Sequence, residues 1–363
     1  MKKLFVTLLA TCVLTSNVYA QKSNEIFSKP KLSGYVIGQY QYSGKDNAKS
    51  NTFSLRMVRL SLDGRLFNDF AYKIQGQING NTSTLSESPR IVDAFVEWQK
   101  YKFVRIKVGQ FKRPFTFENP MNPIDQGFMG YSQNVSNLAG FTDRVGEHSS
   151  NGRDIGVQLQ GDLLKTANGR ALFHYQIGVF NGQGINTKDV DNQKDIIGGI
   201  WIMPVQGMRI GAFGWTGSYA RKGDTGIVSL PKRRYAISGE YVINDWTFRS
   251  EYIHSTDLSF KTSYNEKSDL SNTEINYAKG DKADGFYALA IAPVIKNKFH
   301  IKARYDMYRP SADWNTSKTY YEVGADYEFV KNLKLSAEYI LVNDRSIEKH
   351  NYSMIDTQLS FKF

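Results

Sequence analysis

Apolar and polar residues alternate along most of the chain, two residues per repeat. In one segment Phe70, Tyr72 and Ile74 alternate with Lys73 and Gln75. A period of two places the two sets on opposite faces of a β-sheet. In this segment and the seven below, the apolar set of alternating positions contains no charged residue, although 22% of the chain is charged. Seven further segments show this alternation, at 104–108, 155–163, 173–179, 299–307, 321–329, 333–341 and 355–363.

Eight less regular segments complete a set of about sixteen predicted strands. They lie at 35–42, 53–65, 91–98, 196–203, 208–219, 234–243, 246–254 and 286–295. Short connections at 66–69, 100–101, 204–207, 244–245, 296–297 and 331–332 alternate with long ones at 43–51, 80–90, 113–153, 181–195, 220–233, 255–284 and 343–351. The chain is therefore expected to be all-β, and short periplasmic turns alternating with long extracellular loops are typical of outer-membrane barrels.

The N-terminus has the pattern of a secretory signal peptide. Lys2 and Lys3 precede an apolar run at 4–14, and Val18-Tyr19-Ala20 supplies a cleavage site. We expect a signal peptide at 1–20, a polar periplasmic lead-in at 21–30 and one barrel domain at 31–363. Cys12 is the only cysteine, so cleavage after Ala20 leaves no disulfide or thiol nucleophile; a lipoprotein signal ending at Cys12 is the alternative.

Alternation alone does not separate a membrane barrel from a soluble sheet, because both have one apolar face and one polar face. Export, loop asymmetry and aromatic residues near strand ends, such as Tyr40, Trp98 and Trp246, favour the membrane. The final residue, Phe363, also lies on the apolar phase of its strand. A sheet in lipid has to close because an unpaired backbone group there costs several kcal/mol. We therefore predict a transmembrane antiparallel barrel in which the first and last strands pair.

The composition is basic, with a formal net charge of +11. Loss of Lys2 and Lys3 with the signal removes two basic residues and no acidic one, which gives +9. A basic surface favours anionic solutes or lipids. Contact with anionic headgroups alone would also account for an excess of this size.

Residues 113–153 interrupt the regular spacing of strands, directly after Val108-Gly109-Gln110-Phe111-Lys112-Arg113-Pro114-Phe115. This segment, with Glu118 after it, then Gly152-Arg153-Asp154-Ile155-Gly156 and Val179-Phe180-Asn181-Gly182-Gln183-Gly184, resembles the phosphate-selective porin O and P family. The resemblance covers the mature chain and is strongest between residues 56 and 195. It implies a sixteen-stranded, trimeric porin whose third long loop folds into the lumen.

The strand phase identifies the basic residues that point into such a lumen. The candidate pore-lining residues, including the two that begin the loop, are Arg59, Lys73, Arg105, Lys107, Lys112, Arg113, Lys302 and Arg304. Arg65 lies on the same phase as Arg59, and Arg234 and Arg249 fit the phase less clearly. Basic residues on the second, third and fifth strands would face acidic residues on the fourteenth and fifteenth, such as Glu322 and Glu338, and create a transverse field. That arrangement favours a general porin over a dedicated phosphate channel.

The long loop offers its own candidates. Prolines at 114, 120 and 123 stiffen it, and aromatic side chains such as Phe115 and Phe117 are expected to pack it onto the inner wall. Its candidate constriction residues are Glu118, Asp125 and Arg144. We hypothesise that Glu118 or Asp125 faces Arg105 and Lys107 across the neck. Asp143, Glu147 and His148 contain metal-ligand groups, but spacing alone does not supply the geometry of a site.

The leading hypothesis is a passive porin in the outer membrane of a Gram-negative bacterium. Small hydrophilic solutes diffuse through it with a preference for anions, phosphate being one candidate, and no cofactor, enzymatic activity or nucleic-acid partner is implied. Expected partners are the solute, outer-membrane lipids and two further copies in a homotrimer. A lipase-type or protease-type barrel enzyme is the alternative, and a soluble exported binding protein is a third; no catalytic arrangement of Ser, His and Asp is apparent.

Overall fold

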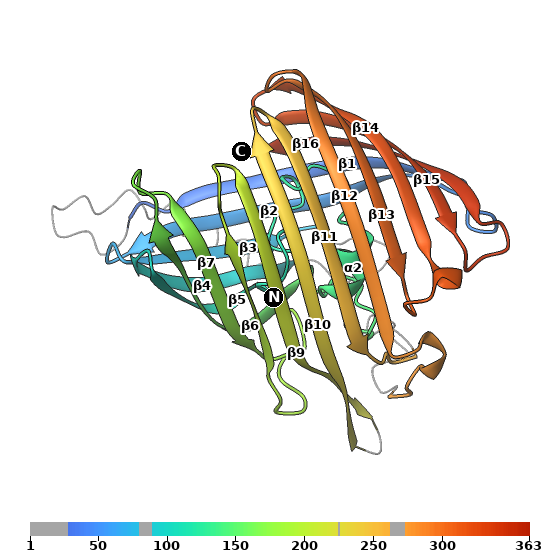
Figure 1. The fold of residues 1–363 in the computed structure, drawn as a ribbon, viewed down its shortest axis with the longest axis horizontal. Helices are drawn as coiled ribbons and strands as arrows, with labels where there is room; N and C mark the ends of the chain where they lie inside the picture. Colours follow the sequence, from blue (N-terminus) through green and yellow to red (C-terminus); the bar gives the residue numbers. More distant parts are fainter. Residues whose placement is uncertain (1–27, 80–88, 224–225, 262–272) are drawn as a thin grey trace.

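In the computed structural model the chain forms a closed antiparallel barrel of sixteen strands (Figure 1). The structure describes residues 28–79, 89–223, 226–261 and 273–363. Each strand pairs with the next in sequence. The strands are β1 (Lys31–Ser43), β2 (Ser50–Leu66), β3 (Phe70–Gln77), β4 (Arg90–Tyr101), β5 (Val104–Lys112), β6 (Arg153–Lys165), β7 (Ala171–Phe180), β8 (Asp195–Ile202), β9 (Met208–Gly223), β10 (Gly226–Ile243), β11 (Trp246–Asp257), β12 (Lys282–Ile295), β13 (Phe299–Arg309), β14 (Lys318–Val330), β15 (Leu333–Asp344) and β16 (Asn351–Lys362). The predicted fold class is confirmed.

Pairing of β1 with β16 closes the sheet, as the membrane argument requires. The register runs from Tyr35 opposite Lys362 to Ser43 opposite Met354. The N–H of Gly34 donates to the Phe363 carbonyl at 2.9 Å, and the N–H of Phe363 donates to the Gly34 carbonyl at 3.0 Å. The last residue of the chain therefore completes the hydrogen bonding of the first strand.

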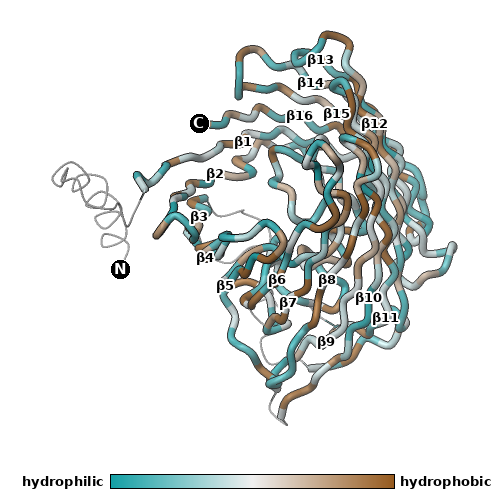
Figure 2. Tube along the Cα trace, turned by 60° about the vertical axis from the view of Figure 1, so that its left-hand side comes forward, coloured by the Kyte–Doolittle hydropathy of each residue, from teal (hydrophilic) through white to brown (hydrophobic). Residues whose placement is uncertain are grey.

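Alternating side chains divide into an exposed apolar outer surface and a polar interior. Ile74, Val108, Val157 and Ile177 are all between 47% and 50% exposed, and none of them has a polar side chain. Figure 2 shows hydrophobic and hydrophilic positions alternating along the strands. Such a surface suits contact with lipid tails. No described helix is long and apolar enough to span a bilayer.

In the part of the chain that the structure describes, three short helical segments lie between strands. They are α2 (Gln133–Leu138), in the connection between β5 and β6, and the 3-10 turns η3 (Tyr277–Lys279) and η4 (Trp314–Thr316). The predicted signal peptide at 1–20 and residues 21–27 of the lead-in lie outside the described residues, as do 80–88 in the loop after β3.

The predicted loop at 220–233 is wrong, because β9 and β10 continue through it and leave residues 224–225 between them. Tyr219 pairs with Leu230 in this extension, and both side chains are buried. They pack with Val145 and Phe260, which come from two other long connections. Basic residues and Pro231 hide the alternation in the sequence, and contacts with other loops, rather than lipid, stabilise the extended hairpin.

Candidate channel and constriction loop

The connection between β5 and β6, residues 113–152, lies inside the barrel, and we name it the constriction loop. Its helix α2 contacts β11, β12 and β13 (Figure 1). At its base the Arg113 N–H donates to the Gly152 carbonyl at 2.8 Å. Gly152 has a φ of +70°, and a Cβ there would meet the Asn119 Oδ1 atom at 1.9 Å. This glycine is therefore required for the loop to close on itself.

Aromatic side chains hold the loop against the inner face of β9 and β8. Phe115 packs edge-on against Trp215 with ring centroids 5.4 Å apart, and Phe117 packs edge-on against Trp201 and Phe213. Phe115 and Phe117 are at most 1% exposed. We name the inward face of β9–β13 that the loop covers the covered wall; its apolar members are Phe213, Trp215, Ala236, Ile253, Ala283, Tyr287 and Leu289. Apolar groups on the inner face of an aqueous barrel are stable here because the loop excludes water from them.

A buried cluster of four charged residues fastens the loop to this wall. The Arg234 guanidinium donates to Asp143 of the loop, with Nη1–Oδ2 and Nη2–Oδ1 distances of 2.6 and 2.7 Å. It also bonds Asp257 at 2.6 Å, and Arg144 of the loop bonds the same carboxylate. All four side chains are at most 2% exposed, and the two arginines balance the two aspartates. Removing one partner would leave a buried charge uncompensated.

The ionisation of Asp143 is set by this cluster. Burial opposes the charged form, but the charge and hydrogen bonds of Arg234, with a contribution from Lys232, outweigh burial and lower the pKa of the Asp143 carboxyl below 3.8. The carboxylate is therefore ionised throughout the neutral range, and the link between loop and wall remains a charge-assisted one.

The base of the loop has its own buried ion pairs. Arg113 donates to Glu147 at 3.0 Å and to Asp154 at 2.9 Å, and all three side chains are fully buried. Lys232 pairs with Asp195 at 3.0 Å, also out of contact with water. The Arg113 contacts join both ends of the loop to β6, and the Lys232 pair joins β10 to β8.

Backbone groups at the middle of the loop are bound by charged side chains of β11, β13 and β15. The Glu251 carboxylate accepts the Phe117 N–H at 2.6 Å, and Glu338 accepts the Met129 N–H at 2.9 Å. Lys302 donates to the Gly127 carbonyl at 3.0 Å, and Arg304 donates to the Gly130 carbonyl at 3.0 Å.

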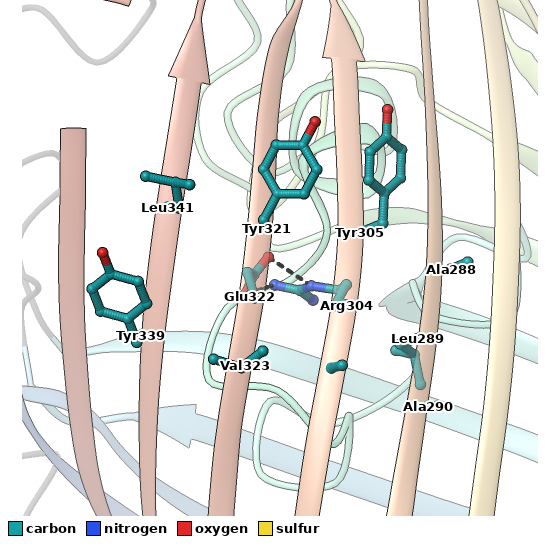
Figure 3. A pocket seen from close by; sticks show the side chains of 11 residues that line it. Ala288, Leu289, Ala290, Arg304, Tyr305, Tyr321, Glu322, Val323, Tyr339 and Leu341 are labelled. Carbon is teal, nitrogen blue, oxygen red and sulfur yellow. Dashed lines mark hydrogen bonds and ion pairs between the residues drawn. The ribbon is translucent and has the colours of Figure 1, made fainter. Parts of the chain in front are cut away.

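The same two cations are neutralised by acids on neighbouring strands. Lys302 pairs with Asp326 and Glu338, and Arg304 pairs with Glu322 at 2.9 Å, as Figure 3 shows for Arg304. Lys302 and Arg304 therefore support the loop and do not present free charge to the lumen.

On the opposite side the inner face stays polar and partly exposed. We name the inward charged residues near the short turns of β2–β6 the open wall; they are Asp63, Lys73, Glu97, Arg105, Lys107 and Asp162. Arg105 pairs with Asp162 at 3.0 Å, and the two side chains are 26% and 27% exposed. Lys107 lies 3.8 Å from Glu97 and is 19% exposed. These pairs are hydrated, so each contributes little to stability.

Above the open wall, four cations gather where the constriction loop leaves the barrel wall, and we name Arg59, Arg90, Lys112 and Arg153 the basic cluster. The charges of Arg59 and Arg153 both act on Arg90 and on Lys112. Among the described residues, the only ion pair of this cluster joins Arg153 to Asp93, at 2.6 Å. The cluster therefore carries an excess of positive charge.

Neutral oxygens satisfy the other members of the basic cluster. Arg59 donates to Gln77 at 3.1 Å and to the Tyr35 hydroxyl at 3.0 Å. The Lys112 ammonium donates to the Tyr131 hydroxyl at 2.7 Å and to two loop carbonyls. Arg90 reaches the Ser149 carbonyl at 3.3 Å, and its Nη2 atom is buried without a hydrogen-bond partner. Arg90 and Lys112 are half-buried, while Arg59 and Arg153 are buried behind them.

Several sequence-based assignments need correction. Arg113 is fully buried within the loop base and does not line a channel. The hypothesis that Glu118 or Asp125 faces Arg105 and Lys107 is wrong. Glu118 is buried against Ser132, whose N–H it accepts at 3.2 Å, and Asp125 pairs with Lys362 at 3.1 Å.

The predicted transverse field is corrected too. Glu322, Asp326 and Glu338 of β14 and β15 are buried and paired with Lys302 or Arg304, so they do not face the basic strands as free acids. Arg144 of the loop is buried with Asp257 and is not free at the constriction. Of the eight candidate pore-lining cations, Lys73, Arg105 and Lys107 are partly exposed and paired with acids, and Arg59 and Lys112 belong to the basic cluster.

Sequence reasoning missed Arg56, Arg90 and Arg153. Arg56 turns inward beside a β-bulge at Ile37 and Gly38 and bonds the Met129 carbonyl, and a bulge breaks the period of two. Arg90 and Arg153 each begin a strand, where alternation gives too few residues to assign a phase. Arg234 and Arg249, which fitted the phase less clearly, both bind the loop.

The described residues contain no group of three or more His, Cys, Asp or Glu side chains placed to hold a metal ion. Of the loop residues with metal-ligand groups, Asp143 is bonded to Arg234 and Glu147 to Arg113. The His148 ring contacts the Ile185 carbonyl at 3.0 Å. The three residues therefore serve different contacts.

Comparison with known proteins adds a family and a set of similar structures. Residues 32–187 match the family model described as phosphate-selective porin O and P. An anion-selective porin from Comamonas acidovorans shares 15% identity and a TM-score of 0.64 over 93% of this chain and 100% of its own. The outer membrane channel DcaP of Acinetobacter baumannii shares 14% identity and a TM-score of 0.61 over 95% and 100%.

A loop-deletion mutant of OmpT, an outer membrane protein of Vibrio cholerae, shares 11% identity and a TM-score of 0.61 over 93% and 100%. No curated protein sequence matches the chain. At these identities the solved structures establish a common fold, that of outer-membrane barrels.

Proposed function

We propose that this outer-membrane porin, whose residues 32–187 match the phosphate-selective porin O and P family, lets small hydrophilic anions diffuse passively through its lumen. The observation that carries the proposal is the basic cluster, in which only Arg153 of the four basic residues is ion-paired, to Asp93, among the residues the structure describes. The constriction loop sets the size of the opening, and the cluster sets the sign of the preferred ion.

The placement of the cluster favours an effect on permeation. Arg90 and Lys112 stand where the loop meets β4 and β5, and the low-dielectric loop and wall around them strengthen their field. The open wall has three cations and three acids, so it adds polarity without net charge. A local excess of positive charge at the narrowest level attracts anions and repels cations.

Neutral hydrogen-bond acceptors hold the cations without neutralising them. Gln77 and Tyr35 fix the Arg59 side chain while leaving its charge uncompensated, and Tyr131 fixes the Lys112 side chain beside it. Such a site supports a broad preference for anions, and phosphate is one of the ions that guanidinium and ammonium groups bind.

Further parts of the proposal rest on the family and the fold. The long-loop end of the barrel faces outside the cell, as in other outer-membrane barrels. One similar structure is described as a trimer form of OmpT, which supports a homotrimer here. A passive channel needs no cofactor and no catalytic residues, and we propose transport rather than catalysis.

Reversal potentials in planar bilayers under a KCl gradient test the proposal. We expect the wild-type protein to be more permeable to chloride than to potassium. Arg90→Gln should lower the permeability ratio several-fold, because the half-buried charge belongs to the cluster. Lys349→Gln removes the same charge from a site that is 76% exposed and distant in sequence, and should leave the ratio unchanged.

Cation preference in the wild-type protein, or equal ratios for Arg90→Gln and wild type, would contradict the proposal. Block of the chloride current by inorganic phosphate, titrated in the same recordings, measures whether phosphate binds more strongly than chloride. Weak block would leave a general anion preference, and strong block would identify phosphate as a favoured solute.

A further inference from the structure

Two cations point outward from the barrel near the long-loop end. Strand register places Thr216, Arg233, Thr256 and Lys282 in one row across β9, β10, β11 and β12. Arg233 and Lys282 are exposed, whereas the residues on either side of Arg233 in sequence are buried in the interior. Neither cation has an ion-pair partner among the described residues. Adjacent strands lie about 4.8 Å apart, so these two long side chains, two strands apart, can converge on one group.

The next row towards the middle of the barrel is aromatic and electrically neutral. Tyr235 stacks on His254 with ring centroids 5.2 Å apart. Asp284 lies beside them in the register, is 2% exposed and accepts hydrogen bonds from Arg309 at 2.7 Å and from Tyr252 at 3.0 Å. Because Arg309 neutralises Asp284, this row does not offset the charges of Arg233 and Lys282.

Below and beside these rows the outer surface is hollowed. A groove of about 790 Å³ extends over β7–β11, with small residues at its floor and apolar side chains along its sides. Gly214 forms part of the floor, and a Cβ at this position would meet no atom within 4 Å. Its lining reaches Arg233, Tyr235 and His254, so the apolar groove opens directly beside Arg233.

A second outer groove lacks this combination. It lies over β12–β15 and is lined by alanines and by Tyr305, Tyr321 and Tyr339 (Figure 3). The charged residues of its lining, Arg304 and Glu322, are at most 4% exposed and pair with each other. Free outward cations and an apolar groove therefore coincide over β7–β12 and not over β12–β15.

We propose that the β7–β12 surface binds a phosphorylated glycolipid of the outer leaflet, with a phosphate between Arg233 and Lys282 and an acyl chain in the groove over Gly214. Guanidinium and ammonium groups form charge-assisted hydrogen bonds with phosphate oxygens. Burying acyl methylenes against the groove is favourable, and an anionic headgroup compensates cations placed at the membrane boundary. The long-loop end lies at the outer leaflet, which places the cations at the level of lipid headgroups.

Native mass spectrometry of the purified full-length protein in detergent tests the site. The probes are bisphosphorylated lipid A, its monophosphorylated form and phosphatidylcholine, each at equal concentration. We expect bisphosphorylated lipid A to remain bound at least tenfold more than phosphatidylcholine. Arg233→Ala with Lys282→Ala should reduce its occupancy about tenfold, and Arg233→Lys with Lys282→Arg should restore most of it.

The groove is tested separately by filling it. Gly214→Leu should reduce lipid A occupancy several-fold, whereas Gly239→Leu should not. Gly239 also faces outward with open space at its Cβ position, but it does not line the groove. Resistance of each variant to heat denaturation on gels confirms that the barrel has folded.

Several results would overturn the proposal. Phosphatidylcholine binding as strongly as lipid A would contradict it, as would unchanged lipid A occupancy in the double alanine variant. Equal losses of lipid A occupancy in Gly214→Leu and Gly239→Leu would contradict it too. Release of a smaller oligomer by Gly214→Leu would instead identify the groove as a contact between copies of the chain. Displacement of lipid A by millimolar inorganic phosphate would show an anion site without acyl recognition and would also overturn it.

Discussion

The covered wall and the open wall follow opposite rules, although both face the interior of one barrel. On β9–β13 the inward positions include Phe213, Trp215 and Ile253, which are at most 4% exposed and pack against the constriction loop. On β2–β6 they include Lys73, Arg105 and Lys107, which are partly hydrated and paired with acids. The interior is therefore divided into a protein-like core and a polar, partly exposed face.

This division explains how a loop can narrow a channel without closing it. Apolar contacts and buried ion pairs fix the loop on one side, where water is excluded and removing one partner of an ion pair leaves a buried, uncompensated charge. The opposite side keeps hydrated charges whose individual contributions to stability are small. The covered wall therefore determines stability and the open wall permeation. Substitutions on one wall should change one property without changing the other.

The largest expected effect is at Arg234, which joins Asp143 of the loop to Asp257 of the covered wall. Arg234→Met leaves two buried carboxylates without their main partner and should cost about 3–5 kcal/mol. Urea unfolding in detergent micelles measures the loss, and limited proteolysis should cut within residues 113–152 more rapidly.

Arg105→Met is the matched control on the open wall, where the side chain is 26% exposed. It should change the free energy of unfolding by about 1 kcal/mol or less. Equal destabilisation by the two substitutions would contradict the distinction between the walls.

A smaller loss is expected from the apolar side of the loop. Phe115→Ala removes a fully buried ring that packs against Trp215 and Phe213, and should cost about 3 kcal/mol. The same unfolding assay measures it. Phe53→Ala removes a ring that is 84% exposed, and a comparable loss there would argue against a packed interface beneath the loop.

The attachment of the loop should also depend on pH. The lowered pKa of Asp143 means that its contribution to stability is complete above about pH 4, near the ordinary carboxyl pKa, and is lost as pH falls through the lower pKa of the folded state. Proteolysis by an acid-active protease should therefore accelerate below about pH 4. Asp143→Asn should be cut more readily at pH 6 and should show a weaker acid dependence; an unchanged dependence would assign the acid effect to other groups.

The smallest effect is expected at Lys107, which is partly hydrated and lies 3.8 Å from Glu97. Lys107→Gln should alter the free energy of unfolding by about 1 kcal/mol or less, because a hydrated pair contributes little. Single-channel conductance should change modestly, with the loop still in place. Release of the loop to proteolysis in this variant would show that the open wall also holds it.

The sequence predicts the barrel well because the period of two is a local property of each strand. Lipid requires an apolar outer phase, so residues such as Ile177 and Val323 are readily assigned. Pairing of β1 with β16 follows from the need to satisfy the edge of the sheet. The sequence does not predict the extension of β9 and β10, because its stabilising contacts, among them Tyr219 with Phe260, come from distant loops.

The site is less predictable because the strand phase shows which side of the barrel a side chain faces, but not which residues it contacts there. Phase places Lys302 and Arg304 inside the barrel, but their binding to Gly127 and Gly130 depends on the path of the loop. Apolar residues in the inward phase, such as Phe213 and Ile253, were the available signal for the wall that the loop covers. Arg90 and Arg153 gave no such signal, since each begins a strand.

Access of an aqueous thiol reagent to the two walls tests the central claim most directly. Lys73→Cys and Ala236→Cys each place a thiol on an inward position, one on the open wall and one under the loop, where Ala236 is 1% exposed. In single-channel recordings a charged methanethiosulfonate reagent should rapidly change the current through Lys73→Cys and leave Ala236→Cys unaffected. Rapid modification of both positions would contradict a loop that seals one wall and leaves the passage along the other.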